Sequence, residues 1–357
     1  MKFFQCSKCL HPVFFENTVC ENCSAPLGYL SSEQVLVALE KDGDAWTAVE
    51  GTGQRFHYCR NHDSGVCNWL IPAAGEKTLC SACELNRTIP NLGDPGNVAA
   101  WQNIEAAKHR LIYSIHRFGL PLQNKAEAPA TGLAFDFLSD EGAPPNVPGI
   151  STGHTRGCIT INIAEADPAH REWTRTRMAE PYRTLIGHFR HEIGHYYWER
   201  LVRSAPDTLT AFRGLFGDER TDYAAALQQY YDDGPPPDWP ERFLTAYAAS
   251  HPWEDWAETW AHYFHIVDTL ETAYAFGFRL RPRRDGAEAF CMQADFDPYR
   301  QPDFDAIIAA GIPLTLAVNS LNRSMGQPDL YPFVLPPPAR EKLRFIHRLI
   351  KEIPPPA

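Results

Sequence analysis

The chain has 357 residues, enough for a sizeable core and for two or three domains. Its formal net charge of −11 argues against a general affinity for nucleic acid or anionic lipid. The first five residues run straight into Cys6 without the apolar segment of a signal peptide. The longest apolar run, residues 306–318, is too short to span a bilayer and contains Pro313. We therefore expect a soluble, cytoplasmic protein with no membrane partner.

Composition divides the chain into a cysteine-rich quarter and a longer helical part. Eight of the ten cysteines lie in the first 83 residues, and six of these form CxxC pairs. In a cytoplasmic chain, clustered CxxC pairs are typical of thiolate metal ligands rather than of disulfides. We expect a zinc ribbon at 1–40, a second four-cysteine module at 41–92, and a third domain at 93–357.

The first cysteine set has zinc-ribbon spacing: Cys6, Cys9, Cys20 and Cys23 form two CxxC pairs separated by ten residues. Each pair forms a tight turn that directs two sulfurs to one point, and two such turns complete a tetrahedron around Zn²⁺. A module this small has little core, so the metal is expected to supply much of its folding free energy.

The second set is more loosely spaced and consists of Cys59, Cys67, Cys80 and Cys83, with His57 and His62 as competing ligands. A second structural zinc is expected here, so the protein would hold one or two structural zincs. Cys158 and Cys291 are isolated and are expected to pack. Residues 1–92 contain seven Lys/Arg and ten Asp/Glu, which leaves no basic surface for phosphate and favours a protein partner for the ribbons over nucleic acid.

A stretch at 157–167, GCITINIAEAD, reads as a β-strand that precedes the central helix. It is either an edge strand with which an extended peptide could pair, or an ordinary central strand.

The central helix carries an HExxH motif, His191-Glu192-Ile193-Gly194-His195. On a helix, positions i and i+4 project from one face, so both imidazoles can reach a single ion. Glu192 lies beside them, placed to take a proton from a water that the ion activates. Gly194 costs about 1 kcal/mol relative to Ala inside a helix, which indicates that another group approaches closely there. His188 is expected to be a neighbour of the site rather than a ligand.

A catalytic zinc needs a third protein ligand, and the best source is a predicted helix at 252–267. Pro252, followed by Glu254 and Asp255, is typical of a helix N-terminus. Glu254 and Glu258 lie at i, i+4 among tryptophans, which suggests buried carboxylates in need of a cation. Glu258 is the first competitor for the third-ligand position, and Asp218 and Glu219 are weaker ones.

These motifs resemble the gluzincins, the thermolysin-like and lethal-factor-like zinc peptidases, in which HExxH precedes a helix with two carboxylates four residues apart. The resemblance implies that Glu254 is the third ligand, that Glu258 orients a ligand histidine, and that Tyr247 stabilises the oxyanion. The stretches "EPYRTLIGHFRHEIGHYYWERL" and "HPWEDWAETWAHY" also resemble a bacterial family of zinc-binding metallopeptidases with an N-terminal zinc ribbon, over nearly the whole chain.

The sequence therefore predicts an α+β protein with zinc-ribbon-type β modules and a mainly helical, zincin-like domain with a small sheet. Its predicted activity is zinc-dependent hydrolysis of a peptide or protein substrate, with Glu192 as general base. Two other functions stay open. One is a protein-binding adaptor in which the ribbons sit on a catalytically idle zincin scaffold. The other, a nucleic-acid-associated regulator, is disfavoured by the charge of residues 1–92.

Overall fold

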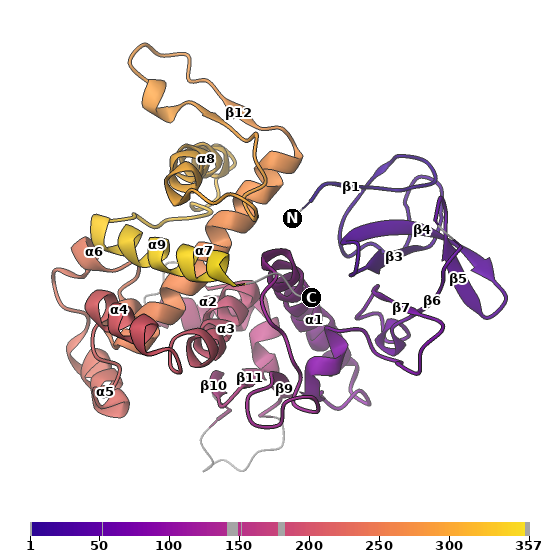
Figure 1. Cartoon of the computed structure of the whole chain (residues 1–357), viewed down its shortest axis with the longest axis horizontal. Coiled ribbons are helices and arrows are strands. Elements are labelled where there is room, and N and C mark those ends of the chain that lie inside the picture. The colour runs from indigo at the N-terminus through magenta and orange to yellow at the C-terminus, as the bar shows by residue number, and fades with distance from the viewer. Residues whose placement is uncertain (1, 52, 141–148, 151, 178–182, 354–357) are drawn as a thin grey trace. The chain divides into compact units, whose positions relative to one another are not determined.

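The computed structural model describes residues 2–51, 53–140, 149–150, 152–177 and 183–353. The chain divides into two compact units (Figure 1). The first comprises Met1–Tyr113 and Leu122–Arg171, and the second comprises Ser114–Pro121 and Glu172–Ala357.

A five-stranded antiparallel sheet of order β3-β4-β5-β6-β7 forms much of the first unit. Its strands are β3 (Leu27–Leu30), β4 (Val35–Asp42), β5 (Ala45–Ala48), β6 (Arg55–Tyr58) and β7 (Leu70–Pro72). Four of its strands each contribute one residue to a buried hydrophobic cluster, which consists of Leu30, Leu39, Phe56 and Leu70. A two-stranded hairpin, β1 (Phe4–Gln5) and β2 (Pro12–Val13), precedes the sheet.

Strand β4 crosses the expected boundary between the two cysteine modules. Its first half pairs with β3, and residues Leu39 to Asp42 pair with β5. The division expected at residue 40 therefore does not coincide with a break in the structure. The first cysteine set precedes this continuous sheet, whereas Cys59 and Cys67 of the second set lie in the connection between β6 and β7.

A second, mixed sheet in the same unit has the order β10-β11-β9-β8. Its strands are β8 (Asn86–Thr88), β9 (Ala134–Leu138), β10 (Gly153–Thr155) and β11 (Cys158–Asn162). The predicted β-run at 157–167 forms β11, which pairs with β10 on one side and with β9 on the other. It is thus an interior strand, and the edge-strand alternative for this run is wrong. The unit also contains most of α1 (Pro95–Phe118) and the start of α2 (Pro168–Arg177).

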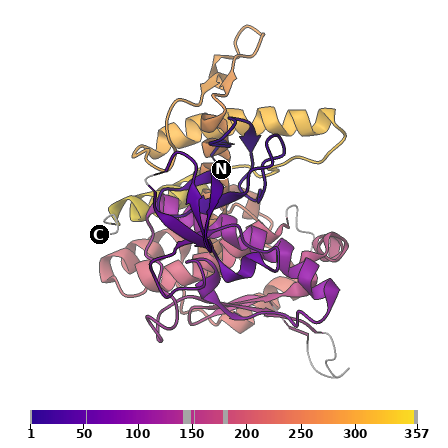
Figure 2. The same cartoon turned by 90° about the vertical axis from the view of Figure 1, so that its right-hand side faces the viewer.

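The second unit is mainly helical and is organised around α7. Its helices are α3 (Leu185–Leu201), α4 (Pro206–Phe216), α5 (Tyr223–Asp233), α6 (Trp239–Arg242), α7 (Pro252–Ala275), α8 (Phe304–Ser324) and α9 (Pro337–Glu352). Helix α7 packs against α3, α4, α8 and α9. A short hairpin of β12 (Arg279–Leu280) and β13 (Met292–Gln293) projects beyond α8 (Figure 2).

Helix α8 extends the apolar run noted in the sequence to 21 residues, with Pro313 inside it. Its most apolar window has a mean hydropathy of 1.6, so by length and composition alone it is able to cross a membrane. The core helix of a soluble protein passes the same test, but such a helix is mostly buried. In α8, 39% of this window is buried.

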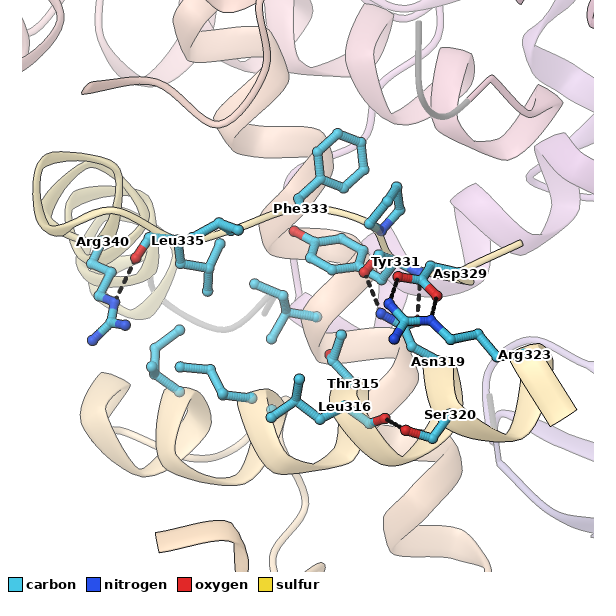
Figure 3. A pocket seen from close by; sticks show the side chains of 16 residues that line it. Thr315, Leu316, Asn319, Ser320, Arg323, Asp329, Tyr331, Phe333, Leu335 and Arg340 are labelled. Atoms are coloured by element: carbon cyan, nitrogen blue, oxygen red, sulfur yellow. Dashed lines mark hydrogen bonds and ion pairs between the residues drawn. The ribbon is translucent and has the colours of Figure 1, made fainter. Parts of the chain in front are cut away.

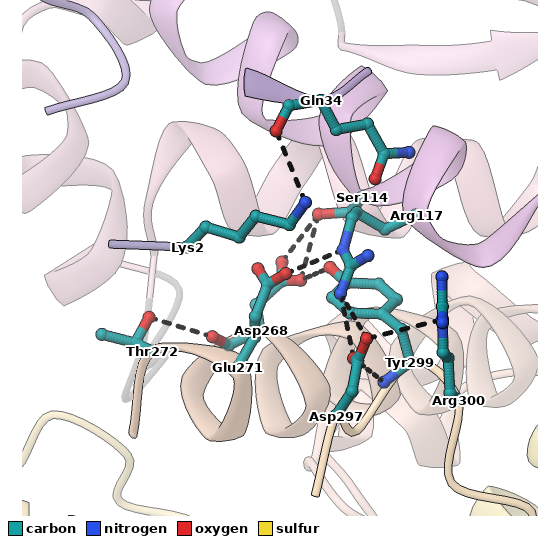
Figure 4. A network of polar contacts seen from close by, with 10 residues as sticks. All are labelled: Lys2, Gln34, Ser114, Arg117, Asp268, Glu271, Thr272, Asp297, Tyr299 and Arg300. Carbon is teal, nitrogen blue, oxygen red and sulfur yellow. Dashed lines mark hydrogen bonds and ion pairs between the residues drawn. The ribbon is translucent and has the colours of Figure 1, made fainter. Parts of the chain in front are cut away.

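A buried polar network ties the last turn of α1 to α7 (Figure 4), and Arg190 joins α3 to the same network. Arg117 pairs with Glu271 and Asp297 at 2.8 and 2.9 Å. Asp268 accepts hydrogen bonds from Ser114, Tyr299 and Arg190. Each of these buried charges has a partner of opposite sign, which offsets the cost of removing it from water. The pair between Arg190 and Asp268 also helps to position α3 against α7.

Candidate metal centre

The first cysteine set converges as the spacing predicts. The four sulfurs lie within 4.8 Å of one another, and two of the separations are 3.7 Å (Cys6 to Cys23) and 3.6 Å (Cys9 to Cys20). Tetrahedral zinc with Zn–S bonds of ~2.3 Å holds its sulfurs about 3.8 Å apart, whereas a disulfide requires about 2.0 Å. The donor set and its spacing therefore fit zinc.

The second set also converges, although its spacing is loose. The sulfurs of Cys59, Cys67, Cys80 and Cys83 lie within 4.8 Å of one another, and all four residues are buried. Neither histidine proposed as a competing ligand belongs to this group. Nδ1 of His62 lies 2.9 Å from the carbonyl oxygen of Cys67, and its ring stacks on Tyr58.

One neighbour of this second set was not predicted. Nε2 of His109, from α1, lies 3.8 Å from Sγ of Cys83. Nδ1 of His109 donates to the backbone carbonyl of Glu105, which fixes the ring. No sequence spacing links residues 83 and 109, so only the fold brings them together. The two isolated cysteines differ: Cys158 is half-buried, whereas Cys291 is exposed and does not pack as expected.

Helix α3 presents the HExxH motif from a buried setting. Thr184 caps its N-terminus by accepting a hydrogen bond from the backbone N–H of Gly187. A Cβ on Gly194 would lie 3.1 Å from Cα of Ala257 and 3.1 Å from Cβ of Trp260. Nε1 of Trp256 donates to the carbonyl of Gly194 at 2.8 Å. The predicted close approach at Gly194 is therefore confirmed, and the approaching element is α7.

Helix α7 begins at Pro252 as predicted, and His251 caps it by accepting from the backbone N–H of Trp253. Nε2 of His251 lies 3.1 Å from the carbonyl oxygen of Thr221, which holds the cap in place. Glu254 and Asp255 in the first turn are each 1% exposed. The helix thus places a fully buried carboxylate, that of Glu254, opposite α3.

His191, His195 and Glu254 form another group of converging ligand atoms, all within 4.8 Å of one another. Nε2 of His191 lies 3.0 Å from one carboxylate oxygen of Glu254, and Nε2 of His195 lies 3.5 Å from the other. Zinc with bonds of 2.0–2.2 Å to nitrogen and oxygen separates its ligands by about 3.4 Å. Two imidazoles and a carboxylate at this spacing fit the donor set of a catalytic zinc site.

Glu258 lies on the other side of the His191 ring. Its Oε1 accepts from Nδ1 of His191 at 2.7 Å, and its Oε2 accepts from Thr245 at 2.7 Å. This hydrogen bond fixes the tautomer that leaves Nε2 of His191 directed at Glu254. Of the two carboxylates left open by the sequence, Glu254 therefore lies with the imidazoles and Glu258 lies behind one of them.

The electrostatics of the group follow from its burial. Although burial opposes the charged form, the carboxylates of Glu254 and Glu258 hold the pKa of His191 well above its usual value. Burial raises the pKa of Glu254, but the two histidines outweigh it and hold that pKa well below the ordinary range. The site thus keeps Glu254 as a buried anion, and a cation bound by His191 would take the place of the proton on that imidazole.

Glu192 is 7% exposed, and its Oε2 is buried with no hydrogen-bond partner among the described residues. A buried carboxylate oxygen without a donor is costly in a purely structural role. Oε2 of Glu254 is likewise buried without a hydrogen-bond partner among the described residues.

Two tyrosines lie at the centre. The ring of Tyr247 lies 6.0 Å from that of His191, and burial followed by the charge of Glu254 raises the pKa of Tyr247 well above its usual value. Tyr223, which the sequence did not single out, donates to Glu254 at 2.8 Å. Both phenols are therefore held in the protonated form that donates hydrogen bonds.

The remaining candidates lie outside the ligand group. Asp218 pairs with Arg220 at 2.7 Å, and Glu219 pairs with Arg213. Both carboxylates thus already have a cationic partner. His188 also lies outside the group, as the sequence predicted.

Residues 97–349 match the model of a family described as "putative zinc-binding metallo-peptidase", and residues 3–94 match a zinc-ribbon domain. Proteins of Mycobacterium bovis and Mycobacterium tuberculosis, both named as uncharacterized, are 42% identical over 357 residues, covering 99% of this chain and 97% of theirs. No solved structure matches. The chain therefore belongs to this family of zinc-binding metallopeptidases and carries its zinc ribbon at the N-terminus.

Proposed function

We propose that the protein is a zinc-dependent peptidase whose catalytic zinc is held by His191, His195 and Glu254, in the manner of a gluzincin. Two further zincs, one in each four-cysteine set, would be structural. The observation that carries the proposal is the buried Oε2 of Glu192, which has no hydrogen-bond partner among the described residues, on the helix that also supplies two members of a converging His–His–Glu group. When bound, zinc would polarise the scissile carbonyl and make a water nucleophilic at neutral pH.

The chain's own groups have separate tasks in this mechanism. Glu192 takes a proton from the attacking water and gives it to the departing amine. Glu258 holds His191 by its Nδ1, so that the imidazole keeps one orientation throughout. The protonated phenol of Tyr247 donates to the oxygen on which negative charge develops. Tyr223 is bonded to Glu254 and acts by orienting that carboxylate.

The test is Glu192→Gln, which removes the base and keeps the shape of the side chain. We expect zinc content to stay at the wild-type level and peptide hydrolysis to fall by about 10²–10⁴-fold, measured on a peptide mixture by mass spectrometry. Glu199→Gln is the matched control, because Glu199 lies on the same helix and contacts only Arg203 among the described ion pairs. Wild-type hydrolysis by Glu192→Gln would contradict the mechanism.

A further inference from the structure

A long apolar trough runs along α8 (Figure 3), and apart from Ile266 of α7 its lining lies within residues 308–340. Its volume is about 440 Å³, within the range of sites that hold small molecules. Helix α8 forms one wall and residues 329–335 form the other. The lining of α8 extends from Ile308 to Arg323, or about 22 Å at 1.5 Å per residue.

The walls of the trough are aliphatic along most of its length. Six of the lining side chains are Ile266, Ile308, Ile312, Leu316, Val334 and Leu335. Two of these are exposed in spite of their apolar character, Val334 by 78% and Leu316 by 46%. Covering this surface with hydrocarbon would stabilise a complex by about 25 cal/mol for each Å² removed from water.

Two polar side chains that line the trough, Asn319 and Ser320, are already bonded to backbone groups of its walls. Both ends of the Asn319 amide are used by the backbone of Tyr331, as donor to its carbonyl at 2.8 Å and as acceptor from its N–H at 3.0 Å. The hydroxyl of Ser320 donates to the carbonyl of Leu316 at 2.7 Å. These two side chains are thus used within the walls of the trough, and an alkyl chain requires no hydrogen-bond partner from them.

The two ends of the trough differ in charge. At one end Arg323 is neutralised by Asp329, with both guanidinium contacts at 2.6 Å. At the other end Nε of Arg340 donates to the carbonyl of Leu335 at 2.9 Å. In the part of the chain that the structure describes, no carboxylate forms an ion pair with Arg340. The guanidinium of Arg340 therefore places one positive charge at this end of the aliphatic trough.

We propose that this trough binds an alkyl carboxylate, such as a free fatty acid, with its head group on Arg340 and its chain along α8. An anionic head group complements Arg340, and the neutralised Arg323–Asp329 end offers no site for a second charge. The binding does not depend on hydrolysis at the metal centre.

Isothermal titration of the full, zinc-loaded chain with decanoate, below its micellar concentration, tests the proposal. Decylammonium and a four-residue aliphatic peptide are titrated in parallel. We expect saturable binding of decanoate at one site and binding of the other two at least tenfold weaker. Equal affinity for decylammonium, tighter binding of the peptide, or no binding of decanoate would overturn it.

Two pairs of variants locate the site. Arg340→Gln should weaken decanoate binding by about tenfold, as loss of a charge-assisted hydrogen bond implies, whereas Arg348→Gln on the same helix should not. Leu316→Glu should abolish binding, whereas Leu321→Glu, which lies on α8 outside the trough, should preserve it. Circular dichroism and zinc content show that each variant is folded. Decanoate binding that survives in Leu316→Glu would place the ligand elsewhere, the metal centre included, and would contradict the proposal.

Discussion

Nδ1 of His191 lies 2.7 Å from Oε1 of Glu258, while the opposite nitrogen of the same ring lies 3.0 Å from Glu254. One imidazole is thus held between two carboxylates with different tasks. Glu258→Gln should lower zinc affinity at this centre about 10–100-fold, because loss of an orienting hydrogen bond from a ligand has this effect. Chelator competition at neutral pH measures it. Glu241→Gln, at an exposed position in α6, is the control, and equal affinity in both variants would contradict the role of Glu258.

Gly194 offers a test of the packing between α3 and α7. Ala is favoured over Gly by about 1 kcal/mol in a helix, yet a Cβ here would lie 3.1 Å from Ala257 and from Trp260. We expect Gly194→Ala to lower the free energy of unfolding by about 1–3 kcal/mol, as overpacking does. Gly214→Ala in α4 is the matched control, since nothing lies within 4 Å of its Cβ. Gly214→Ala should raise the free energy of unfolding, whereas Gly194→Ala should lower it. Denaturant unfolding of the two variants measures both changes.

The number of zincs, and the order in which they leave, test the assignment of the three ligand groups. Wild type should hold about three zincs for each chain, and His191→Ala about two, by elemental analysis. In the first cysteine set Cys9 and Cys23 are half-buried, whereas all four residues of the second set are buried. A chelator should therefore remove zinc from the first set before the second. Mass spectrometry of rapidly alkylated cysteines follows this order, and earlier labelling of Cys59 or Cys80 would contradict it.

Stability should decrease in mild acid because of His347. Its Nε2 lies 2.9 Å from the carbonyl oxygen of Pro302 and its Nδ1 lies 2.9 Å from the hydroxyl of Tyr263, an arrangement that suits a neutral ring with Nδ1 as acceptor. Burial lowers the pKa of His347. Below pH ~6.5 the unfolded chain then binds a proton that the folded chain does not. The free energy of unfolding should fall by up to about 1.4 kcal/mol for each pH unit.

His347→Gln should flatten this slope between pH 6.5 and 5. Urea unfolding gives the free energy of unfolding of wild type and variant at each pH. Taking the difference between the two proteins removes the effect of zinc loss in acid, which both share. Parallel slopes in the two proteins would show that His347 does not carry the effect.

Periodicity and motif spacing correctly predicted the features that are formed by residues close together in the sequence. The helix around HExxH, the start of α7 at Pro252 and the Cys6–Cys23 group all depend on residues within a few turns of one another. The approach predicted at Gly194 is also confirmed, because a glycine that costs helix stability is informative on its own.

Contacts between distant segments could not be predicted in this way. The hydrogen bonds of Tyr223 to Glu254 and of Thr245 to Glu258 join separate elements, and no spacing in the sequence marks them. The same holds for His109 beside Cys83. The composition of the run at 157–167 suits both an edge and an interior strand, because pairing on the second side depends on β9 and β10.

Strand β4 has a consequence for attempts to study the N-terminal ribbon by itself. A chain ended at residue 40 would keep the pairing of β4 with β3 but lose the partner that β5 provides. The severed strand would present unpaired N–H and C=O groups to solvent, which is a template for pairing with another copy. Aggregation of such a fragment would therefore reflect a cut sheet and not a failure to bind zinc. A fragment that keeps β7 and continues past Cys83 avoids the cut and retains the second cysteine set.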